Sequence, residues 1–160
     1  MTQSKKRIAE SRVTLSALMG PKDTNSRGNV HGGVIMKMMD EAAALAAMRH
    51  ACRPAVTVAV DSMTFMHPIH VGMLVMCHAE LAYVGHTSME IRVEVVAENP
   101  LAGTSILSNT AYLVFVALGD DGRPTTVPGL IYETDEERTR AQRGEERQAY
   151  RKKQRSREME

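Results

Sequence analysis

Residues 28–50 read GNVHGGVIMKMMDEAAALAAMRH, in which a glycine pair opens a long apolar segment. Apolar side chains recur at helical spacing from Val34 onward, and this pattern predicts a helix over 33–50 that is buried on most of its faces. The alanines of its second half are strong helix formers, and their small side chains let a neighbouring backbone approach closely. We therefore expect a sheet to wrap around this helix.

Segments with strand chemistry lie on both sides of the helix. One expected strand covers 12–19, and four alternating, β-branched segments follow Pro54, at 55–65, 71–84, 87–97 and 105–117. The Gly85-His86 pair is short enough for a tight hairpin, so the strands are most economically antiparallel neighbours. The order β-α-β-β-β-β predicts an α+β fold with one helix against one face of a sheet.

The C-terminal residues differ in composition from the rest. Acidic and basic residues alternate from Glu133 onward, and the last stretch turns basic at 151–157. Thr134 and Glu137 have the reciprocal spacing of a helix capping box, which predicts a solvent-exposed helix. We expect one domain at 9–131 and a charged, helical C-terminal extension at 132–160.

Composition excludes several classes of protein. A net charge of +1 argues against the strong basic field of a nucleic-acid-binding protein. No apolar run approaches the roughly 20 residues of a membrane span, and no signal-peptide core precedes the cysteines. Cys52 and Cys77 have no Cys-x-x-Cys spacing and are expected to be reduced core thiols. The sequence predicts a soluble, cytoplasmic protein without a membrane contact.

The start of the predicted helix has the chemistry of an oxyanion site. The N–H groups of a helix's first turn lack intrahelical partners, and the helix dipole adds positive charge there. Gly32 and Gly33 carry no side chains that would keep a substrate's carbonyl group from the backbone. Together with the adjacent His31, they are candidate substrate-binding residues that suit a thioester oxygen.

Asp40 is the second candidate for chemistry. Its carboxylate stands two turns into the helix among methionines and alanines, where an unpaired charge costs free energy. A role as general base or as nucleophile would explain it. At roughly 1.5 Å per residue, however, Asp40 is too far along the axis to act on a carbonyl held at Gly33 of its own helix. The complementary group would then come from another subunit.

Each of these residues also has a purely structural explanation. The glycine pair is a common start of a helix, Asp40 and Glu41 could form an exposed stripe, and Asn29 could shape an Asx turn. His67 and His70 have no third ligand at metal spacing, and a turn explains them better, so we expect no metal site. The sequence contains neither a phosphate-loop pattern nor a Gly-x-Ser-x-Gly elbow.

Four blocks follow one another within residues 9–150. They are GNVHGG at 28–33, MKMMDEAA at 36–43, VAVDSMTF at 58–65 and GHTSMEI at 85–91. Together they resemble the hotdog-fold acyl-CoA thioesterases related to the cytosolic acyl-CoA hydrolases. The resemblance implies a five-stranded antiparallel sheet around one long central helix. It also implies homodimers that pair sheet to sheet and commonly assemble as trimers of dimers.

The resemblance also implies roles for individual residues. Asn29 of one chain and Asp40 of its partner would be the catalytic pair. The residues expected to bind CoA lie in the blocks that resemble CoA-contacting strands: Ser62, Gly85, Thr87 and Ser88. His86 departs from the family, where a basic residue such as arginine is frequent, and this departure puts a phosphate contact there in doubt.

Three functions follow from these observations. The leading one is hydrolysis of fatty acyl-CoA to free acid and CoA by a homo-oligomer that needs no metal or redox cofactor. A hotdog dehydratase or hydratase acting on acyl thioesters would need His31 as its base. A non-catalytic protein would be an acyl-CoA-binding regulator, or a scaffold that uses the basic tail as an interaction arm.

Overall fold

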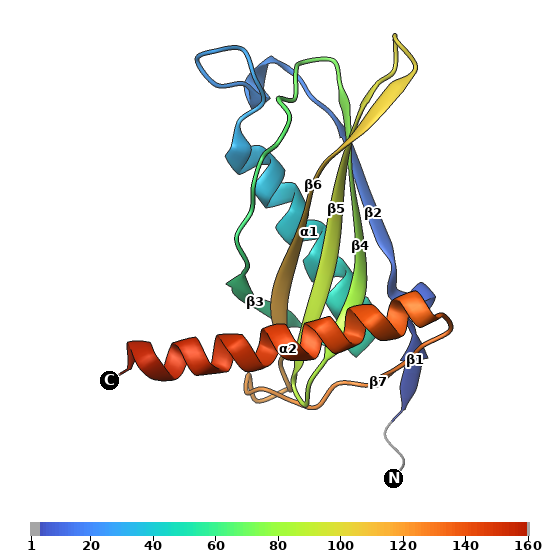
Figure 1. Ribbon diagram of the computed structural model, residues 1–160, viewed down its shortest axis with the longest axis vertical. Coiled ribbons are helices and arrows are strands. Elements are labelled where there is room, and N and C mark those ends of the chain that lie inside the picture. The colour runs from blue at the N-terminus through green and yellow to red at the C-terminus, as the bar shows by residue number, and fades with distance from the viewer. Residues whose placement is uncertain (1–3, 160) are drawn as a thin grey trace.

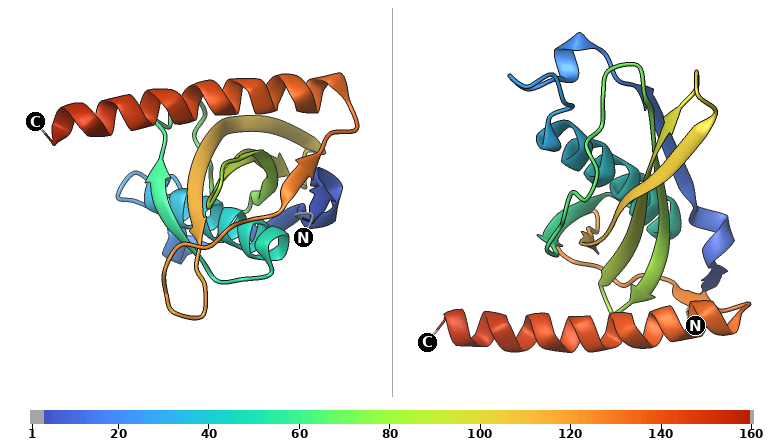
Figure 2. Two further views of the ribbon diagram at one scale, coloured as in Figure 1. Left: turned by 90° about the horizontal axis from the view of Figure 1, so that it is seen from below. Right: turned by 45° about the horizontal axis from the view of Figure 1, so that its top comes forward.

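The computed structural model describes residues 4–159, and these form three layers. The long helix α1 (Gly32–Ala51) lies in the concave face of a curled antiparallel sheet, and helix α2 (Asp135–Glu158) crosses the outer face of the same sheet (Figures 1 and 2). The predicted α+β class, the five-stranded sheet around a central helix and the C-terminal helix are confirmed.

The sheet has the strand order β2-β4-β5-β6-β3, and all neighbours are antiparallel. The strands are β2 (Val13–Leu18), β3 (Ala55–Val60), β4 (Leu74–Val84), β5 (Ser88–Asn99) and β6 (Thr104–Ala117). The expectation that consecutive strands are neighbours is wrong for β3 and β4. The irregular connection 61–73 between them is long enough to carry the chain across the sheet, so β3 becomes the edge strand beside β6.

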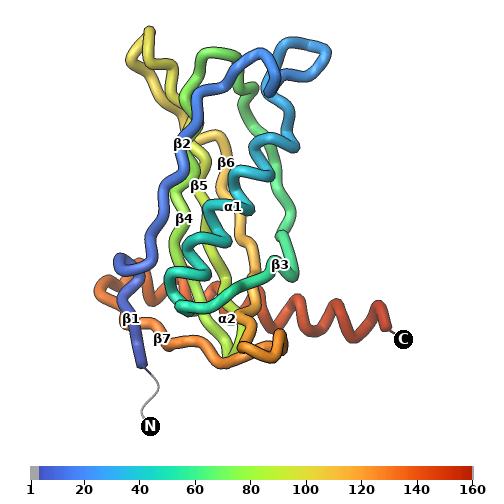
Figure 3. The backbone as a smooth tube through the Cα atoms, turned by 180° about the vertical axis from the view of Figure 1, so that it is seen from behind, coloured from blue at the N-terminus to red at the C-terminus, as the bar shows by residue number. Residues whose placement is uncertain are grey.

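Residues 61–65 were expected to continue the strand of β3, and this expectation is also wrong, since the strand ends at Val60. The sequence analysis did not predict a small parallel sheet of β1 (Lys5–Arg7) and β7 (Gly129–Ile131), which lies at one end of the molecule (Figure 3). Two short 3-10 helices, η1 (Ile8–Ser11) and η2 (Pro21–Asp23), flank β2.

The core forms where α1 meets the concave face of the sheet. Met39 and four alanines of α1, at positions 42, 43, 46 and 47, pack there without exposed surface, against inward-facing side chains of the central strands such as Val93 and Val95. The small alanine side chains leave the sheet room to curl around the helix, as the sequence predicted. The buried residues of α1 are Ile35, Met39, Ala42, Ala43, Ala46, Ala47 and His50.

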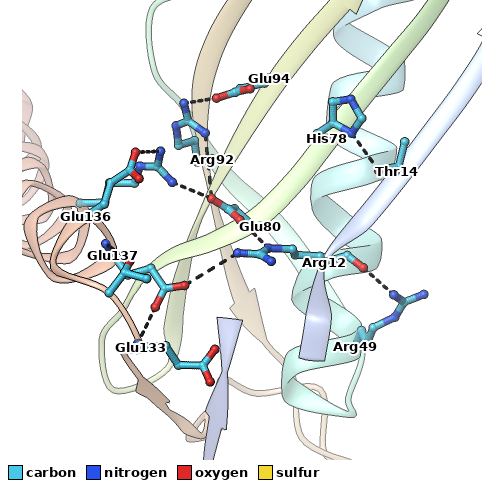
Figure 4. A network of polar contacts seen from close by, with 12 residues as sticks. Arg12, Thr14, Arg49, His78, Glu80, Arg92, Glu94, Glu133, Glu136 and Glu137 are labelled. Carbon is cyan, nitrogen blue, oxygen red and sulfur yellow. Dashed lines mark hydrogen bonds and ion pairs between the residues drawn. The ribbon is translucent and has the colours of Figure 1, made fainter. Parts of the chain in front are cut away.

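Helix α2 begins as predicted, with the Thr134 hydroxyl accepting a hydrogen bond from the N–H of Glu137. The expectation that this helix is solvent-exposed is wrong for one face, because Glu137, Ala141 and Gly144 form a buried stripe against the sheet, while most of its other residues are exposed. Around the first half of α2, Glu80 of β4 receives a hydrogen bond from Arg140 at 2.9 Å, within a wider polar network (Figure 4). Ion pairs and small residues therefore hold this helix in place.

The second half of α2 is held by a buried carboxylate. Glu90 of β5, whose side chain is 1% exposed, accepts hydrogen bonds from Arg147 at 2.6 Å and from Arg151 at 2.9 Å. Arg147 also stacks over the ring of Tyr112 at 3.7 Å from its centroid. Burial alone would lower the pKa of Arg147, but its hydrogen bonds with Glu90 and that residue's charge outweigh burial and raise it. We call Glu90, Arg147 and Arg151 the buried clamp.

Gly144 is where α2 comes closest to the sheet. A Cβ atom built at this position would lie 2.5 Å from the Cβ of Tyr83 and 3.1 Å from a carboxylate oxygen of Glu90. We expect Gly144→Ala to lower the free energy of unfolding by about 1–3 kcal/mol, since the overlap outweighs the better helix propensity of alanine. Urea unfolding measures this effect. Gln142→Ala, at an exposed position of the same helix, is the control and should leave stability unchanged or slightly higher.

The two cysteines differ in environment. Cys77 is fully buried as predicted, and burial raises the pKa of its thiol to about 11. The expectation of a core position is wrong for Cys52, which follows α1 in a left-handed conformation (φ 52°) and is exposed. Both are free thiols. Within residues 4–159, no helix is long and apolar enough to cross a membrane.

Candidate active site

The start of α1 borders a cleft of about 340 Å³. Asn29 and Gly32 line one side of this cleft, and the irregular segment 65–69, which includes Phe65 and His67, lines the other. The backbone there is fixed by hydrogen bonds on both sides, from the N–H of His31 to the carbonyl of Asp23 and from the N–H of Val30 to the carbonyl of Ile69. The loop before α1 is therefore anchored at the point where the helix begins.

The polar groups at this helix start are free to bind a ligand. Within residues 4–159, neither the side-chain amide of Asn29 nor the N–H groups of Gly32 and Gly33 make a hydrogen bond to the protein. A Cβ atom added at Gly33 would meet no other atom within 4 Å, so this glycine faces open space. His31 is the exposed residue before the helix and does not cap it with its side chain. The arrangement presents unpartnered donors at the positive end of a helix dipole.

Asp40 lies on the side of α1 that faces β3. Its carboxylate is half-buried and accepts a hydrogen bond of 2.7 Å from the hydroxyl of Thr57. This bond fixes one carboxylate oxygen and leaves the other without a protein partner in the described chain, 4–159. Thr57 thus orients the carboxylate, and the second carboxylate oxygen remains available to accept a proton or to attack a substrate.

One chain does not bring Asn29 and Asp40 together. Asp40 stands eight residues beyond the first helical residue, Gly32, which places it roughly 12 Å farther along the axis at about 1.5 Å per residue. The cleft beside Asn29 does not include Asp40 among its lining residues. Within one chain, the two predicted catalytic residues therefore do not form a joint site.

The residues that the resemblance assigns to CoA binding lie on the other face of the sheet, beside α2. Thr87 and Ser88 line a groove there, and the Ser88 hydroxyl accepts a hydrogen bond of 2.9 Å from Gln148. Gly85 lies against the same helix, since an added Cβ would be 2.7 Å from Gln148. Ser62 is separate from this groove and lies in a shallow hollow beside Arg147 and Arg151.

The sequence analysis missed two groups of residues. Thr57 belongs to the β-branched run AVTVAV, which reads as strand chemistry, so nothing in the sequence marked it as the partner of Asp40. The side chains of Gln148, Lys152 and Arg155 lie beside Thr87 and Ser88, but their helix was interpreted as a solvated extension.

Comparison with known proteins identifies the family. The family model described as the thioesterase superfamily matches residues 27–104. The chain is similar to YkhA, an uncharacterized acyl-CoA thioester hydrolase of Bacillus subtilis, with 37% identity over 86% of this chain and 83% of that protein. The chain belongs to the acyl-CoA thioester hydrolase family.

A longer relative and two solved structures support the assignment of the thioesterase to this family. The cytosolic acyl coenzyme A thioester hydrolase of Rattus norvegicus is 36% identical over 88% of this chain, although the match spans only 37% of the rat protein. An apo-hexameric acyl-CoA thioesterase superposes with a TM-score of 0.90 at 34% identity, covering 94% of this chain and 97% of that chain.

The acyl-CoA hydrolase of Staphylococcus aureus, in complex with butyryl-CoA, CoA and CoA disulfide, has a TM-score of 0.89 at 34% identity, covering 97% of this chain and 94% of that chain. Variants of that enzyme in which an aspartate, an asparagine or a threonine is replaced by alanine have also been solved.

Proposed function

We propose that the thioesterase hydrolyses acyl-CoA at a site shared between two subunits, with Asn29 and the α1 start of one chain and Asp40 of the other. This proposal rests on one observation: within a single chain, the hydrogen-bond donors at the α1 start and the Asp40 carboxylate are far apart. Unpartnered donors lie at one end of α1, while a carboxylate aligned by Thr57 lies about two turns away. Neither group suffices alone, so two chains in opposite orientation would complete two sites.

The chemistry follows from these groups. The N–H groups of Gly32 and Gly33 donate hydrogen bonds to the thioester oxygen and stabilise the negative charge that develops on it. As general base, Asp40 removes a proton from the attacking water, and this proton then goes to the leaving thiolate. As nucleophile, it attacks the thioester carbon directly, and water then hydrolyses the resulting mixed anhydride to the free acid and supplies the proton for the thiolate. Asn29 orients the water or the carbonyl group. The carbon–sulfur bond breaks, and CoA leaves as its thiol while the acyl group becomes a free acid.

The types of residue studied in a relative support this assignment. The aspartate, asparagine and threonine replaced in the S. aureus enzyme are the same three residue types as Asp40, Asn29 and Thr57. We further propose that the chain works in the cytoplasm as a homodimer, three of which form a hexamer, without a metal or redox cofactor. The hexameric relatives and the relative named as cytosolic support the assembly and the location.

A panel of acyl-CoA substrates from acetyl to palmitoyl tests the function. Release of the CoA thiol, followed with a thiol reagent, should be rapid for at least one chain length and should survive His31→Ala. Hydration or dehydration of an acyl-CoA without release of thiol, lost in His31→Ala, would instead support a dehydratase or hydratase. No CoA release from any member of the panel by the folded wild type would overturn the proposed function.

Thr57→Val should reduce kcat by about tenfold to a hundredfold, because it removes the hydrogen bond that orients Asp40. Valine keeps the shape and β propensity of threonine, so the melting temperature should change little. Thr57→Ser retains the hydroxyl and is the matched control, with kcat near that of the wild type. Steady-state hydrolysis of a single acyl-CoA measures the effect, and equal kcat values for the valine and serine variants would contradict the orienting role.

A further inference from the structure

His50 lies near the end of α1, where this helix meets the small sheet of β1 and β7 (Figure 3). Its side chain has no exposed surface. The ring nitrogen Nε2 lies 2.8 Å from the carbonyl oxygen of Pro128, the residue directly before β7. The backbone carbonyl of His50 accepts a hydrogen bond of 2.8 Å from the ammonium group of Lys6 in β1. One residue of α1 is therefore bonded to both chain segments that form the small sheet.

The hydrogen bond to Pro128 determines which nitrogen of the neutral ring carries the hydrogen. A carbonyl oxygen can only accept, so Nε2 donates, and Nδ1 of the neutral ring carries a lone pair instead. Nδ1 is buried and has no hydrogen-bond partner among residues 4–159. Protonation would place a new N–H group and a positive charge at this nitrogen, where no acceptor receives them. The surroundings of His50 therefore favour the neutral ring.

The charges around the ring do not reverse this preference. Burial is the main influence and lowers the pKa of His50 from its usual value. The hydrogen bond with Pro128 and the charge of Glu10 in η1 act in the opposite direction, while the charge of Lys6 lowers the pKa further. Lys6 and Glu10 are the charged groups that act on the ring within the described part of the chain. A proton on His50 is thus poorly compensated while the ring stays buried.

We propose that His50 is an acid-sensitive latch, which holds the small sheet of β1 and β7 against the end of α1 while its ring is neutral and releases this sheet when the ring is protonated. The latch is complete at a pH above about 6.5 and weakens below it, since a released ring then binds a proton more readily than the buried ring. Release would free the attachment of α2, because only residues 132–134 separate β7 from that helix. The latch does not depend on the proposed function.

Hydrogen exchange under native conditions tests the latch. The N–H group of Gly129 donates to the carbonyl of Ser4 at 3.2 Å, so its protection reports the pairing of β1 with β7. After correction for the intrinsic effect of pH on exchange, this protection should fall in the wild type by up to about tenfold per pH unit below about pH 6.5. Amides of the central strand β5 should keep their protection, because the large sheet stays closed.

His50→Gln separates the hydrogen bond from the titration. Glutamine can still donate to the carbonyl of Pro128 but takes up no proton, so the protection of Gly129 in this variant should not change between about pH 7 and 5.5. The matched control is His78→Gln, which removes an exposed histidine of β4 and should retain the pH dependence of the wild type.

Three results would overturn the latch. The first is protection of Gly129 that does not depend on pH in the wild type, and the second is the same pH dependence in His50→Gln as in the wild type. The third is an equal loss of protection in β5, which would show that acid unfolds the whole chain. If His50→Gln does not fold, NMR titration of the wild-type ring decides, since a pKa of His50 above about 6.5 would contradict the inference.

Discussion

Replacing Asp40 with asparagine should reduce kcat for acyl-CoA hydrolysis by about a thousandfold while leaving the fold intact. A general base contributes roughly 10²–10⁴ to a rate, and a nucleophile at least as much, so either role of Asp40 predicts a loss of this order. Asparagine has nearly the same volume and can still accept the hydrogen bond from Thr57, which holds the side chain in the wild type. KM for the substrate should change little.

The control for this substitution is Glu41→Gln, which removes the neighbouring carboxylate. Glu41 is exposed and lies near Lys37 on the solvent side of α1, so its loss should leave kcat within about twofold of the wild type. Circular dichroism and the melting temperature should match for all three proteins. A kcat of Asp40→Asn within tenfold of the wild type would exclude Asp40 as base or nucleophile.

Glu90→Ala should lower the free energy of unfolding by about 3 kcal/mol. Breaking a buried ion pair by removing one partner typically costs about 3–5 kcal/mol, because the other charge is left uncompensated. Here the loss leaves Arg147 and Arg151, which are 26% and 20% exposed, without the carboxylate that holds both. We use the lower end of that range because the two arginines keep some contact with water. The second half of α2 should then detach from the sheet.

Urea unfolding measures the stability of this variant, and hydrogen exchange of α2 amides reports detachment directly. Glu94→Ala is the matched control, since Glu94 lies on the same strand and pairs with Arg92 at a more exposed position. The control should cost no more than about 1 kcal/mol. Equal losses in the two variants would show that the buried clamp contributes nothing beyond a surface ion pair.

The central part of the fold could be predicted from the sequence because local patterns determine it. A helix wrapped by an antiparallel sheet could be predicted from three features: the periodicity of α1, the alanines of its second half and the alternating segments after Pro54. The position of β3 at the sheet edge could not be predicted, because strand order depends on the path of the connection 61–73 and on contacts across the sheet. No local sequence pattern reports either of these.

The packing of α2 escaped prediction for a different reason. Its buried stripe consists of Glu137, Ala141 and Gly144, and such polar and small residues do not register as an apolar face. The carboxylates that receive this helix, Glu80 and Glu90, stand at outward-facing positions of β4 and β5 and look solvent-exposed in the sequence. Only the structure pairs these charges across more than fifty residues of chain.

The candidate site was predictable in its parts. The glycine pair and Asp40 attract attention because their chemistry is out of place in an ordinary helix, and helix geometry alone separates them. The hydrogen bond from Thr57 to Asp40 depends on the register between a helix and a strand, which no sequence pattern reports. The same is true of the groove beside α2, where cations of that helix lie near Thr87 and near Ser88 at the start of β5.

The central claim is that each site combines Asn29 of one chain with Asp40 of another, and mixing two inactive variants tests it directly. Asn29→Ala and Asp40→Asn chains are coexpressed with different tags, and dimers that carry both tags are counted by native mass spectrometry. Random pairing makes about half of the dimers hybrids, each with one intact site of two, so activity should return to about a quarter of the wild-type value. Hybrid dimers no more active than the two parent variants would contradict the shared site.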